Sequence, residues 1–212
     1  MEDFYELPKI NFQSYEEFEV YKCHCRSCPI GKVYNKVVLS DGNKTNPKVV
    51  VVGEAPGKDE LEENKPFVGK CGKLLRETLE KNGFNETNSL ITNLMPCRPE
   101  NNKFPKDESV IHSCKNMWLK SEIKLLNPDF LLIIGSKPLK FLLGLDAITK
   151  SRGIWYNKKL NGKLVRILPT FHPSYVQRTQ YSKDKEYVGK FFQQDIENIA
   201  KLAGFTNNIY KN

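Results

Sequence analysis

Cysteine is the residue with the most distinctive chemistry in this chain of 212 residues, and it occurs six times. Cys25-Arg-Ser-Cys28 is a Cys-x-x-Cys pair, and Cys97 and Cys114 follow much later. Thiolates at such spacings bind zinc or iron–sulfur clusters, although a single Cys-x-x-Cys also occurs in redox sites or by chance. The pattern indicates a metal or iron–sulfur site. The complete set is Cys23, Cys25, Cys28, Cys71, Cys97 and Cys114.

A glycine-rich turn, Gly53-Glu-Ala-Pro-Gly-Lys58, follows the first strongly apolar run. It differs from a phosphate-binding loop, because Gly53 and Gly57 are one residue too close together. Asp59 also stands where such a loop needs a Ser or Thr to bind Mg²⁺. Nucleotide hydrolysis is therefore disfavoured. The turn instead offers two glycines for close backbone approach and one carboxylate, Glu54, at the end of a strand.

An alternation of strands and helices must position these residues. It must also position two later segments, residues 93–99, which end in Cys97-Arg-Pro, and residues 172–178, which begin with His172-Pro-Ser. Continuous apolar runs predict buried parallel strands at 48–52, 89–94, 130–134 and 164–168. Periodicity predicts helices at 15–21, 69–82, 107–127, 139–143 and 184–203, with a hairpin-like stretch around 156–163. This order predicts a parallel sheet covered on both faces, with its ligand at the carboxyl ends of the strands.

The charge of the chain favours a polyanionic partner. The formal net charge is +8, from 33 Lys and Arg against 25 Asp and Glu. Residues 1–22 are acidic, so the excess of positive charge lies in the rest of the chain. A basic body is typical of proteins that bind nucleic acid, although abundant Lys and Asn also accompany AT-rich coding.

The domain organisation is expected to be simple, with residues 1–22 as an N-terminal appendage and residues 23–212 as one domain. The acidic and aromatic appendage either packs on the sheet, which we favour, or docks a partner. No apolar run approaches the roughly 18 residues of a membrane span. The chain opens on the acidic Met1-Glu-Asp-Phe-Tyr-Glu instead of a signal segment, so a cytoplasmic location is expected.

Three patterns together resemble one known family: Gly53-Glu-Ala-Pro-Gly with Pro66-Phe-Val-Gly, Asn93 with Cys97-Arg-Pro, and His172-Pro-Ser ending in Arg178. The chain resembles the iron–sulfur uracil-DNA glycosylases, family 4 of their superfamily, which also has relatives fused to phage DNA polymerases. The cysteines and the order of the motifs agree with this resemblance. It implies an α/β fold, a three-layer α/β/α sandwich with a central parallel sheet of four strands.

The resemblance implies a base-binding pocket that includes Gly53 and Ala55. Phe67 matches the aromatic residue on which a flipped base stacks, and Asn93 matches the residue that reads the pyrimidine edge. An Asn amide accepts from uracil N3–H and donates to O4, whereas cytosine presents the opposite partners. Without the family context, core packing would be the favoured interpretation of Phe67, and a turn that of Asn93.

The resemblance also implies catalytic groups. His172 matches the residue that stabilises negative charge on uracil O2 as the glycosidic bond breaks. Ala55 stands where the superfamily often has an Asp that orients water. Glu54 or Glu60 is then the candidate for positioning water or stabilising the oxocarbenium-like sugar, and the sequence leaves this choice open. A solvated surface role is the alternative for each.

DNA contacts are implied for two segments. Residues that would bind phosphate and wedge the duplex follow the fourth strand; they are Pro173, Ser174, Tyr175 and Arg178. Ser174 is equally suited to cap a helix. Asn101 and Lys103 are expected to contact the DNA backbone. The segment 100–105 contains no histidine, which argues against covalent capture of abasic DNA.

The resemblance assigns four cysteines as ligands of a [4Fe–4S] cluster: Cys25, Cys28, Cys97 and Cys114. Structural zinc is the alternative metal. Cys23 forms a competing Cys-x-Cys with Cys25, so the identity of the first ligand stays open, and His24 is a less favoured alternative ligand. Cys71 is expected to be a small, buried or partly exposed side chain.

The expected function is a monofunctional glycosylase, which hydrolyses the N-glycosidic bond of a flipped uracil and leaves an abasic site. It is expected to act as a monomer on DNA, with single-stranded or mismatched uracil preferred because less pairing and stacking must be broken. Two alternatives remain: a glycosylase for a modified pyrimidine, and an inactive iron–sulfur module that only binds DNA.

Overall fold

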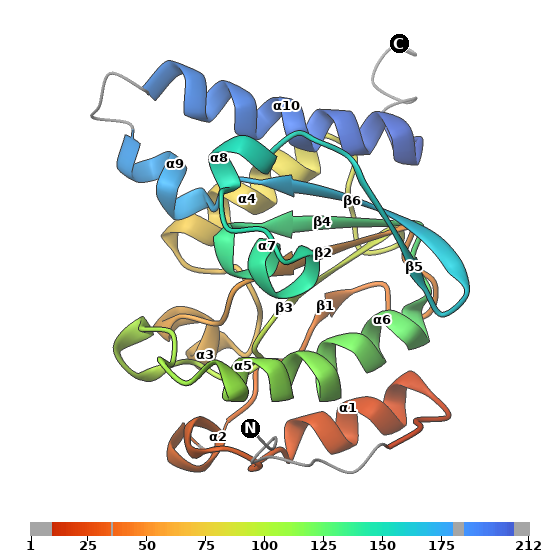
Figure 1. Ribbon diagram of the computed structural model, residues 1–212, viewed down its shortest axis with the longest axis vertical. Helices are drawn as coiled ribbons and strands as arrows, with labels where there is room; N and C mark the ends of the chain where they lie inside the picture. Colours follow the sequence, from red (N-terminus) through yellow and green to blue (C-terminus); the bar gives the residue numbers. More distant parts are fainter. Residues whose placement is uncertain (1–9, 35, 180–184, 206–212) are drawn as a thin grey trace.

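Four parallel strands form the centre of the sheet in the computed structural model, which describes residues 10–34, 36–179 and 185–205 (Figure 1). The order across the sheet is β1-β3-β2-β4-β6-β5, and the two edge strands pair antiparallel to their neighbours. The strands are β1 (Asp41–Gly42), β2 (Val49–Gly53), β3 (Ser89–Asn93), β4 (Phe130–Ile134), β5 (Tyr156–Leu160) and β6 (Lys163–Thr170).

The central strands are buried on both faces, and alternate side chains enter two separate cores. Val50 and Val52 of β2 join one core, whereas Val49 and Val51 join the other. This alternation follows from the two-residue period of a strand. Because both faces of the sheet are covered, the sequence of β2 is an unbroken run of apolar residues.

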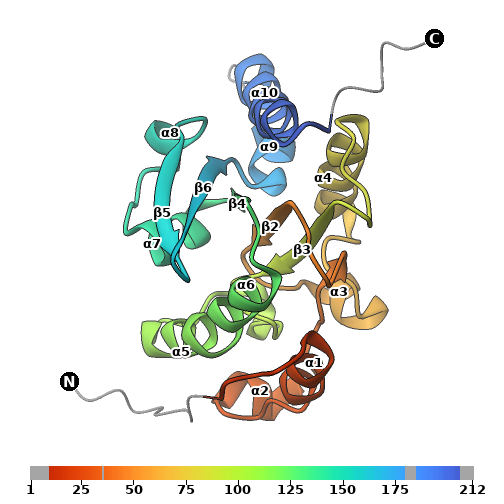
Figure 2. The same cartoon turned by 90° about the vertical axis from the view of Figure 1, so that its right-hand side faces the viewer.

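Helices cover each face of the sheet. Figure 2 shows α4, α9 and α10 on one side and α5 and α6 on the other, with α1 and α2 forming a further layer outside α5 and α6. The helices are α1 (Tyr15–Cys23), α2 (Pro29–Tyr34), α3 (Lys58–Glu63), α4 (Lys70–Lys81), α5 (Glu108–Cys114), α6 (Lys120–Leu126), α7 (Ser136–Leu143), α8 (Ile148–Ser151), α9 (Pro173–Thr179) and α10 (Lys185–Ala203). A 3₁₀ turn spans Glu100–Asn102, and a π-helical turn, Lys115–Leu119, joins α5 to α6.

Helix α1 packs into the core instead of lying loose at the surface. Ser14 caps it by accepting a hydrogen bond from the Glu17 N–H, and Tyr15 and Phe18 are buried. The Phe18 ring meets Trp118 with ring centroids 5.9 Å apart. The aromatic residues at 12, 15 and 18 are buried as expected, but α1 packs mainly on α6 and the π-helical turn rather than directly on the sheet. The residues at 4 and 5 lie outside the described residues.

A buried polar network ties α1 to α6 and β3. The Lys22 ammonium lies 3.1 Å from the fully buried Glu122 carboxylate. Three hydroxyl groups also donate to this carboxylate, those of Tyr15 at 2.6 Å, Ser40 at 2.5 Å and Thr92 at 2.8 Å. A buried charge is tolerated only when it is paired and hydrogen-bonded in this way.

The expected α/β architecture is confirmed, but the sheet has six strands where four were predicted. The four predicted strands are the parallel ones. The additional strands are at the edges, where burial is incomplete and no apolar run marks them. Strand β1 has only two residues, and β5 joins β6 through Asn161-Gly162, both with positive φ, as in a tight hairpin turn. No helix within the described residues is long and apolar enough to cross a membrane.

Candidate active site

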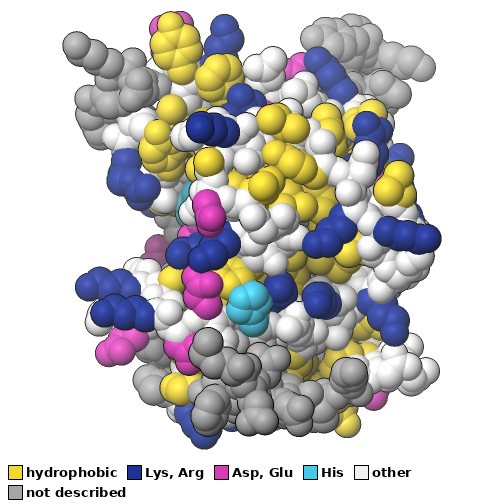
Figure 3. Space-filling model, in the orientation of Figure 1, with side chains coloured by type: hydrophobic (Ala, Val, Ile, Leu, Met, Phe, Trp, Pro, Cys, Tyr) yellow, Lys and Arg dark blue, Asp and Glu magenta, His cyan; other side chains and the backbone are white. Residues whose placement is uncertain are grey.

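A cavity of about 580 Å³ opens at the carboxyl ends of the parallel strands. The arrowheads of β4 and β6 point to this edge in Figure 1, and the molecular outline is indented there in Figure 3. Eight of the predicted site residues line the cavity: Glu54, Ala55, Glu60, Phe67, Asn93, His172, Ser174 and Arg178. Segments far apart in the sequence therefore form one site, as the strand order predicted.

Gly53 ends β2 beside Asn93 at the end of β3, but it is not among the residues that line the cavity. A Cβ atom on Gly53 would lie 2.3 Å from the Phe67 ring and 2.4 Å from Asn93 Oδ1. No side chain fits in that space. The absence of a side chain at Gly53 allows the Phe67 ring and the Asn93 amide to meet over the end of β2.

The Asn93 side chain is available to a ligand. It ends β3 and is 8% exposed. Its amide has no hydrogen-bond partner among the described residues, and it lines the cavity. The cavity therefore contains a donor and an acceptor, side by side, that a bound molecule can satisfy.

Phe67 has a backbone conformation that side chains rarely adopt, with φ +56°. A Cβ on Gly72 would lie 2.2 Å from the Phe67 carbonyl carbon, so α4 approaches this backbone closely. The ring is 7% exposed, and its centroid lies 6.3 Å from that of His172. Strained backbone conformations of this kind persist where the surrounding structure requires them, often at binding sites.

His172 is poised as a neutral hydrogen-bond donor. Its Nδ1 accepts from the Ser174 backbone N–H at 3.2 Å and lies 2.8 Å from the Ser174 hydroxyl. An accepting Nδ1 assigns the proton of the neutral ring to Nε2. Burial, together with the positive charge of Arg178, lowers the pKa of His172 to about 4, so the ring is neutral at physiological pH.

Glu54 presents a half-buried carboxylate to the cavity. Its Oε1 accepts from the Lys137 backbone N–H at 3.3 Å, in the first turn of α7. Burial raises the pKa of Glu54, and the backbone N–H groups of Lys137 and Ser136 act in the opposite direction. A Cβ on Gly135 would lie 2.6 Å from Glu54 Oε1, so the glycine before α7 gives this carboxylate its space.

Glu60 also lines the cavity, but its oxygens are engaged by the backbone. Oε2 accepts from the Gly57 N–H at 3.0 Å, and Oε1 accepts from the Val68 N–H at 3.1 Å and the Gly69 N–H at 2.9 Å. These contacts begin α3 and fix the loop that follows Phe67. Glu60 therefore organises the loop, whereas Glu54 has the more available carboxylate.

Of the residues of α9 expected to contact DNA, Ser174 and Arg178 line the cavity, whereas Pro173 and Tyr175 do not. Pro173 is buried at the start of α9, and the Tyr175 ring packs against Phe171. The exposed Arg178 donates from Nη1 to the Ser174 hydroxyl oxygen at 3.3 Å. Ser174 thereby connects the exposed guanidinium to His172.

The loop after β3 contributes three cavity residues that sequence reasoning did not assign to the site, Pro99, Asn102 and Phe104. Asn101 and Lys103, which were predicted, are exposed beside them and are not among the residues lining the cavity. Asn101 and Asn102 both have positive φ, which turns the chain sharply. An aromatic residue within a polar loop was the only available signal for Phe104.

Lys137 is a further residue beside the site that sequence reasoning missed. Its backbone N–H contacts Glu54, and its ammonium lies 5.5 Å from the centre of the Phe104 ring. The Gly135-Ser136 turn between β4 and α7 could have indicated a helix start at this edge of the sheet, but nothing in the sequence pairs it with Glu54. The half-buried Cys71 also lines the cavity and donates to Gln177 Oε1 at 3.1 Å.

The four cysteines predicted to bind a cluster lie in one region. The hydrogen bond with Cys114 lowers the pKa of Cys28 to about 6 and raises that of Cys114. Burial, with the nearby Cys25 and Cys28, raises the pKa of Cys97 to about 12. Cys23 instead bonds to the Val20 carbonyl oxygen, as does His24. No three His, Cys, Asp or Glu side chains in the described ranges converge as a single-ion site requires.

Comparison with known proteins agrees with this geometry. Residues 39–194 match the model of the uracil DNA glycosylase superfamily. The chain belongs to this superfamily. The type-4 uracil-DNA glycosylase of Thermotoga maritima is 34% identical over 186 residues, covering 85% of this chain and 88% of that protein. The corresponding protein of Archaeoglobus fulgidus is 32% identical over 185 residues, with the same two coverages.

A DNA polymerase of Bacillus phage SP01 is 28% identical over 172 residues, which cover 81% of this chain but 17% of that protein. Both expected resemblances, to type-4 uracil-DNA glycosylases and to a phage polymerase, are confirmed. The part of this chain that matches the superfamily, residues 39–194, contains every predicted base-pocket residue and ends within α10. Cys25 and Cys28 lie before this part, so the match includes only two of the four predicted cluster ligands.

Proposed function

We propose that this protein is a monofunctional DNA glycosylase that excises uracil and leaves an abasic site. The observation that carries the proposal is the unpaired Asn93 amide, which shares one cavity with the Phe67 ring and the neutral His172. A pyrimidine needs an edge reader, an aromatic surface and a donor to its departing oxygen. The type-4 relatives support the same assignment.

Asn93 reads the base. Its Oδ1 accepts from uracil N3–H, and its Nδ2 donates to O4. Cytosine presents an acceptor and a donor at the same positions, so buried groups would lose their partners at a cost of about 1–3 kcal/mol each. Phe67 supplies the surface on which the base stacks, which contributes about 1–3 kcal/mol per base.

His172 stabilises the leaving group. As the N-glycosidic bond breaks, negative charge develops on uracil O2, and the Nε2–H of the neutral ring donates to it. A donor aimed at developing charge in a site shielded from water is usually the largest single catalytic contribution. Ser174 fixes the tautomer that makes this donation possible.

Glu54 acts on the opposite side of the broken bond. Its carboxylate either positions the attacking water or stabilises the oxocarbenium-like sugar. We assign this role to Glu54 over Glu60, because three backbone N–H groups already occupy the Glu60 oxygens. Arg178, with Ser174, Tyr175 and Pro173, would contact the DNA backbone at the cavity mouth, and Asn101 and Lys103 would do so from the loop after β3.

We further propose that Cys25, Cys28, Cys97 and Cys114 bind a [4Fe–4S] cluster. The donor set fits, because four thiols are gathered and each iron of such a cluster takes one thiolate, so the sulfurs need not converge on one ion. Cys23 is directed toward the Val20 carbonyl, which favours Cys25 as the first ligand. The cluster would join the segment after α1 to the loop after β3 and has no step in base excision.

A panel of oligonucleotides tests the function. Each carries one uracil, cytosine, thymine or other 5-substituted uracil, placed in a single strand, in a mismatch or in a base pair. Alkali then cleaves at any abasic site. We expect cleavage at uracil and none at cytosine, and faster cleavage in single strands or mismatches than in paired DNA. Cleavage only at a 5-substituted base would show a modified-pyrimidine glycosylase. Binding without cleavage of any base would show a binding module and contradict the proposal.

A further inference from the structure

We propose that Arg76, oriented by Asp41, is a positioning residue that sets the conformation of the base-stacking Phe67. This inference rests on the proposed function, because it gives Arg76 a role in base binding. Arg76 itself does not line the cavity of the active site. It lies on α4, behind the loop that carries Phe67.

The contacts of Arg76 are to the backbone of that loop. Its Nε donates to the Phe67 carbonyl oxygen at 3.0 Å, and its Nη2 donates to the Pro66 carbonyl oxygen at 2.5 Å. A planar guanidinium that bonds two successive carbonyls fixes the direction of both peptide groups. The residue fixed in this way is the one with φ +56°.

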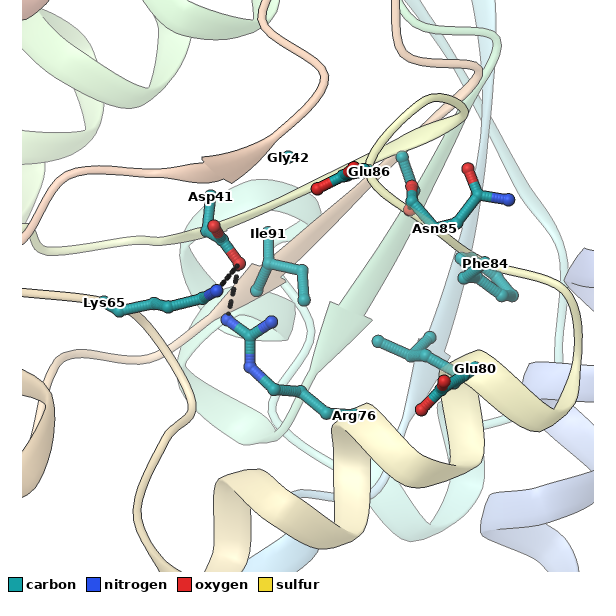
Figure 4. Close-up of a pocket in the computed structure, with 11 residues that line it drawn as sticks. Asp41, Gly42, Lys65, Arg76, Glu80, Phe84, Asn85, Glu86 and Ile91 are labelled. Carbon is teal, nitrogen blue, oxygen red and sulfur yellow. Dashed lines mark hydrogen bonds and ion pairs between the residues drawn. The ribbon is translucent and has the colours of Figure 1, made fainter.

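Asp41 completes the arrangement from the edge of the sheet. Its Oδ2 lies 2.8 Å from Arg76 Nη2 and 3.3 Å from the ammonium of Lys65, the residue before Pro66. Figure 4 shows Arg76 extending from α4 and Lys65 from the loop, with both pointing at this carboxylate. Strand β1 pairs Asp41 with Ile91 of β3, so the carboxylate has a fixed position on the sheet.

These contacts meet a need of the loop. The Phe67 ring must lie over Gly53 to leave the Asn93 amide accessible, and this requires a rare backbone conformation. Glu60 fixes the residues that follow Phe67, through the N–H groups of Val68 and Gly69. Arg76 fixes the two carbonyls of Pro66 and Phe67. The loop is thus constrained on both sides of the strained residue.

A second interpretation of this region is a ligand site in the hollow of about 450 Å³ around Arg76, but the charges that line the hollow do not favour it. Asp41 already pairs with both cations that line it, Lys65 and Arg76. The other charged residues in its lining are acidic, Glu80 and Glu86. The geometry therefore assigns Arg76 to positioning.

A double-mutant cycle between Arg76→Ala and Phe67→Ala tests the proposal, with single-turnover uracil excision measured against DNA concentration. Loss of the stacking surface in Phe67→Ala should raise the DNA concentration at half-saturation about tenfold. Arg76→Ala should raise this concentration by a similar factor, with a smaller change in the maximal rate. Because Arg76 acts through Phe67, the double variant should be no worse than Phe67→Ala.

Arg76→Lys provides a second variant in case Arg76→Ala does not fold. It retains the charge near Asp41 but cannot bond both carbonyls, so it should show part of the same defect. Glu80→Gln is the matched control, because Glu80 lines the same hollow and its side chain does not contact the loop. Its half-saturation should equal that of the wild type.

Hydrogen exchange of the peptide that covers residues 65–70 provides a readout independent of activity. Exchange should become faster in Arg76→Ala and Arg76→Lys and stay unchanged in Glu80→Gln. Unchanged exchange, or additive losses in the double variant, would overturn the positioning role. A wild type that shows no uracil excision would contradict the proposed function alone, and the exchange comparison would still decide whether Arg76 orders the loop.

Discussion

At the scale of single residues, the site depends on how the environment sets the protonation of two side chains. His172 is kept neutral by burial and by Arg178, and the half-buried carboxylate of Glu54, which follows β2, faces the first turn of α7. Neither property is visible in the sequence. Both follow from side chains that only the fold brings near, and both lead to measurable pH dependence.

The depressed pKa of His172 predicts that stability falls in acid. The unfolded chain binds a proton at His172 near pH 6.5, whereas the folded protein binds it near pH 4. This contribution to stability is therefore complete above pH 6.5 and is lost as the pH falls toward 4. Between about pH 7.5 and 4.5, the wild type should lose about 2 kcal/mol more than His172→Gln. Urea unfolding at both pH values measures the difference; equal losses would contradict the assigned environment.

The two glutamates should behave differently. Glu54→Gln removes the catalytic carboxylate and should lower the maximal excision rate by about 100-fold or more, with little change in stability. Glu60→Gln replaces one acceptor oxygen with an NH₂ donor, so at least one of the three backbone N–H groups loses its partner. The change should cost about 1–3 kcal/mol of stability while the maximal rate falls less. Thermal unfolding and single-turnover rates of both variants separate the roles. The reverse ranking of rates would make Glu60 the catalytic residue.

The acid limb of the rate profile provides a further check on Glu54. Burial raises the pKa of Glu54 above its usual value of 4.5, so the ionised form and the rate should be lost as the pH falls through that raised pKa. In Glu54→Gln this limb should be absent. Rate profiles of the two proteins test the expectation, and an acid limb that persists unchanged in the variant would contradict it.

At the scale of elements, the buried network joins α1 to the strand that carries Asn93. Lys22→Ala would leave the Glu122 charge buried without its cation, which costs about 3–5 kcal/mol. Replacing both residues with apolar side chains, as Lys22→Met with Glu122→Leu, should recover much of that loss. Urea unfolding measures both effects. A Lys22→Ala variant as stable as the wild type would show that the pair does not stabilise α1.

The elements also show what the sequence could predict. Strands β2, β3, β4 and β6 were predictable because burial on both faces requires apolar runs such as Val49–Val52. Strand β1 was not, because Asp41 and Gly42 pair with β3 through their backbones and carry no apolar signal. A shared edge was predictable for Asn93 and His172, because parallel strands end together there, whereas the roles of the site residues were implied by the family resemblance. The partners that orient them, Lys137 and Arg76, are distant in sequence and were not.

At the scale of the whole molecule, the proposed cluster would join the N-terminal layer to the α/β body. Cys97→Ser should lower the iron content and the thermal midpoint, whereas Cys23→Ala should change neither. Iron, sulfide and zinc analysis of the purified protein, with visible absorbance, measures the cofactor directly. Iron retained in Cys97→Ser, or lost in Cys23→Ala, would contradict the assigned ligand set, and stoichiometric zinc would replace the cluster with a zinc site.

The central claim is that Asn93 and His172 act together on a uracil extruded into the cavity. Its most direct test is single-turnover excision from a labelled single strand containing one uracil, comparing the wild type with Asn93→Ala and His172→Ala at matched cofactor content. We expect cleavage by the wild type and a rate at least about 100-fold lower in each variant. Wild-type protein that does not cleave, or variants that cleave as fast as the wild type, would contradict it.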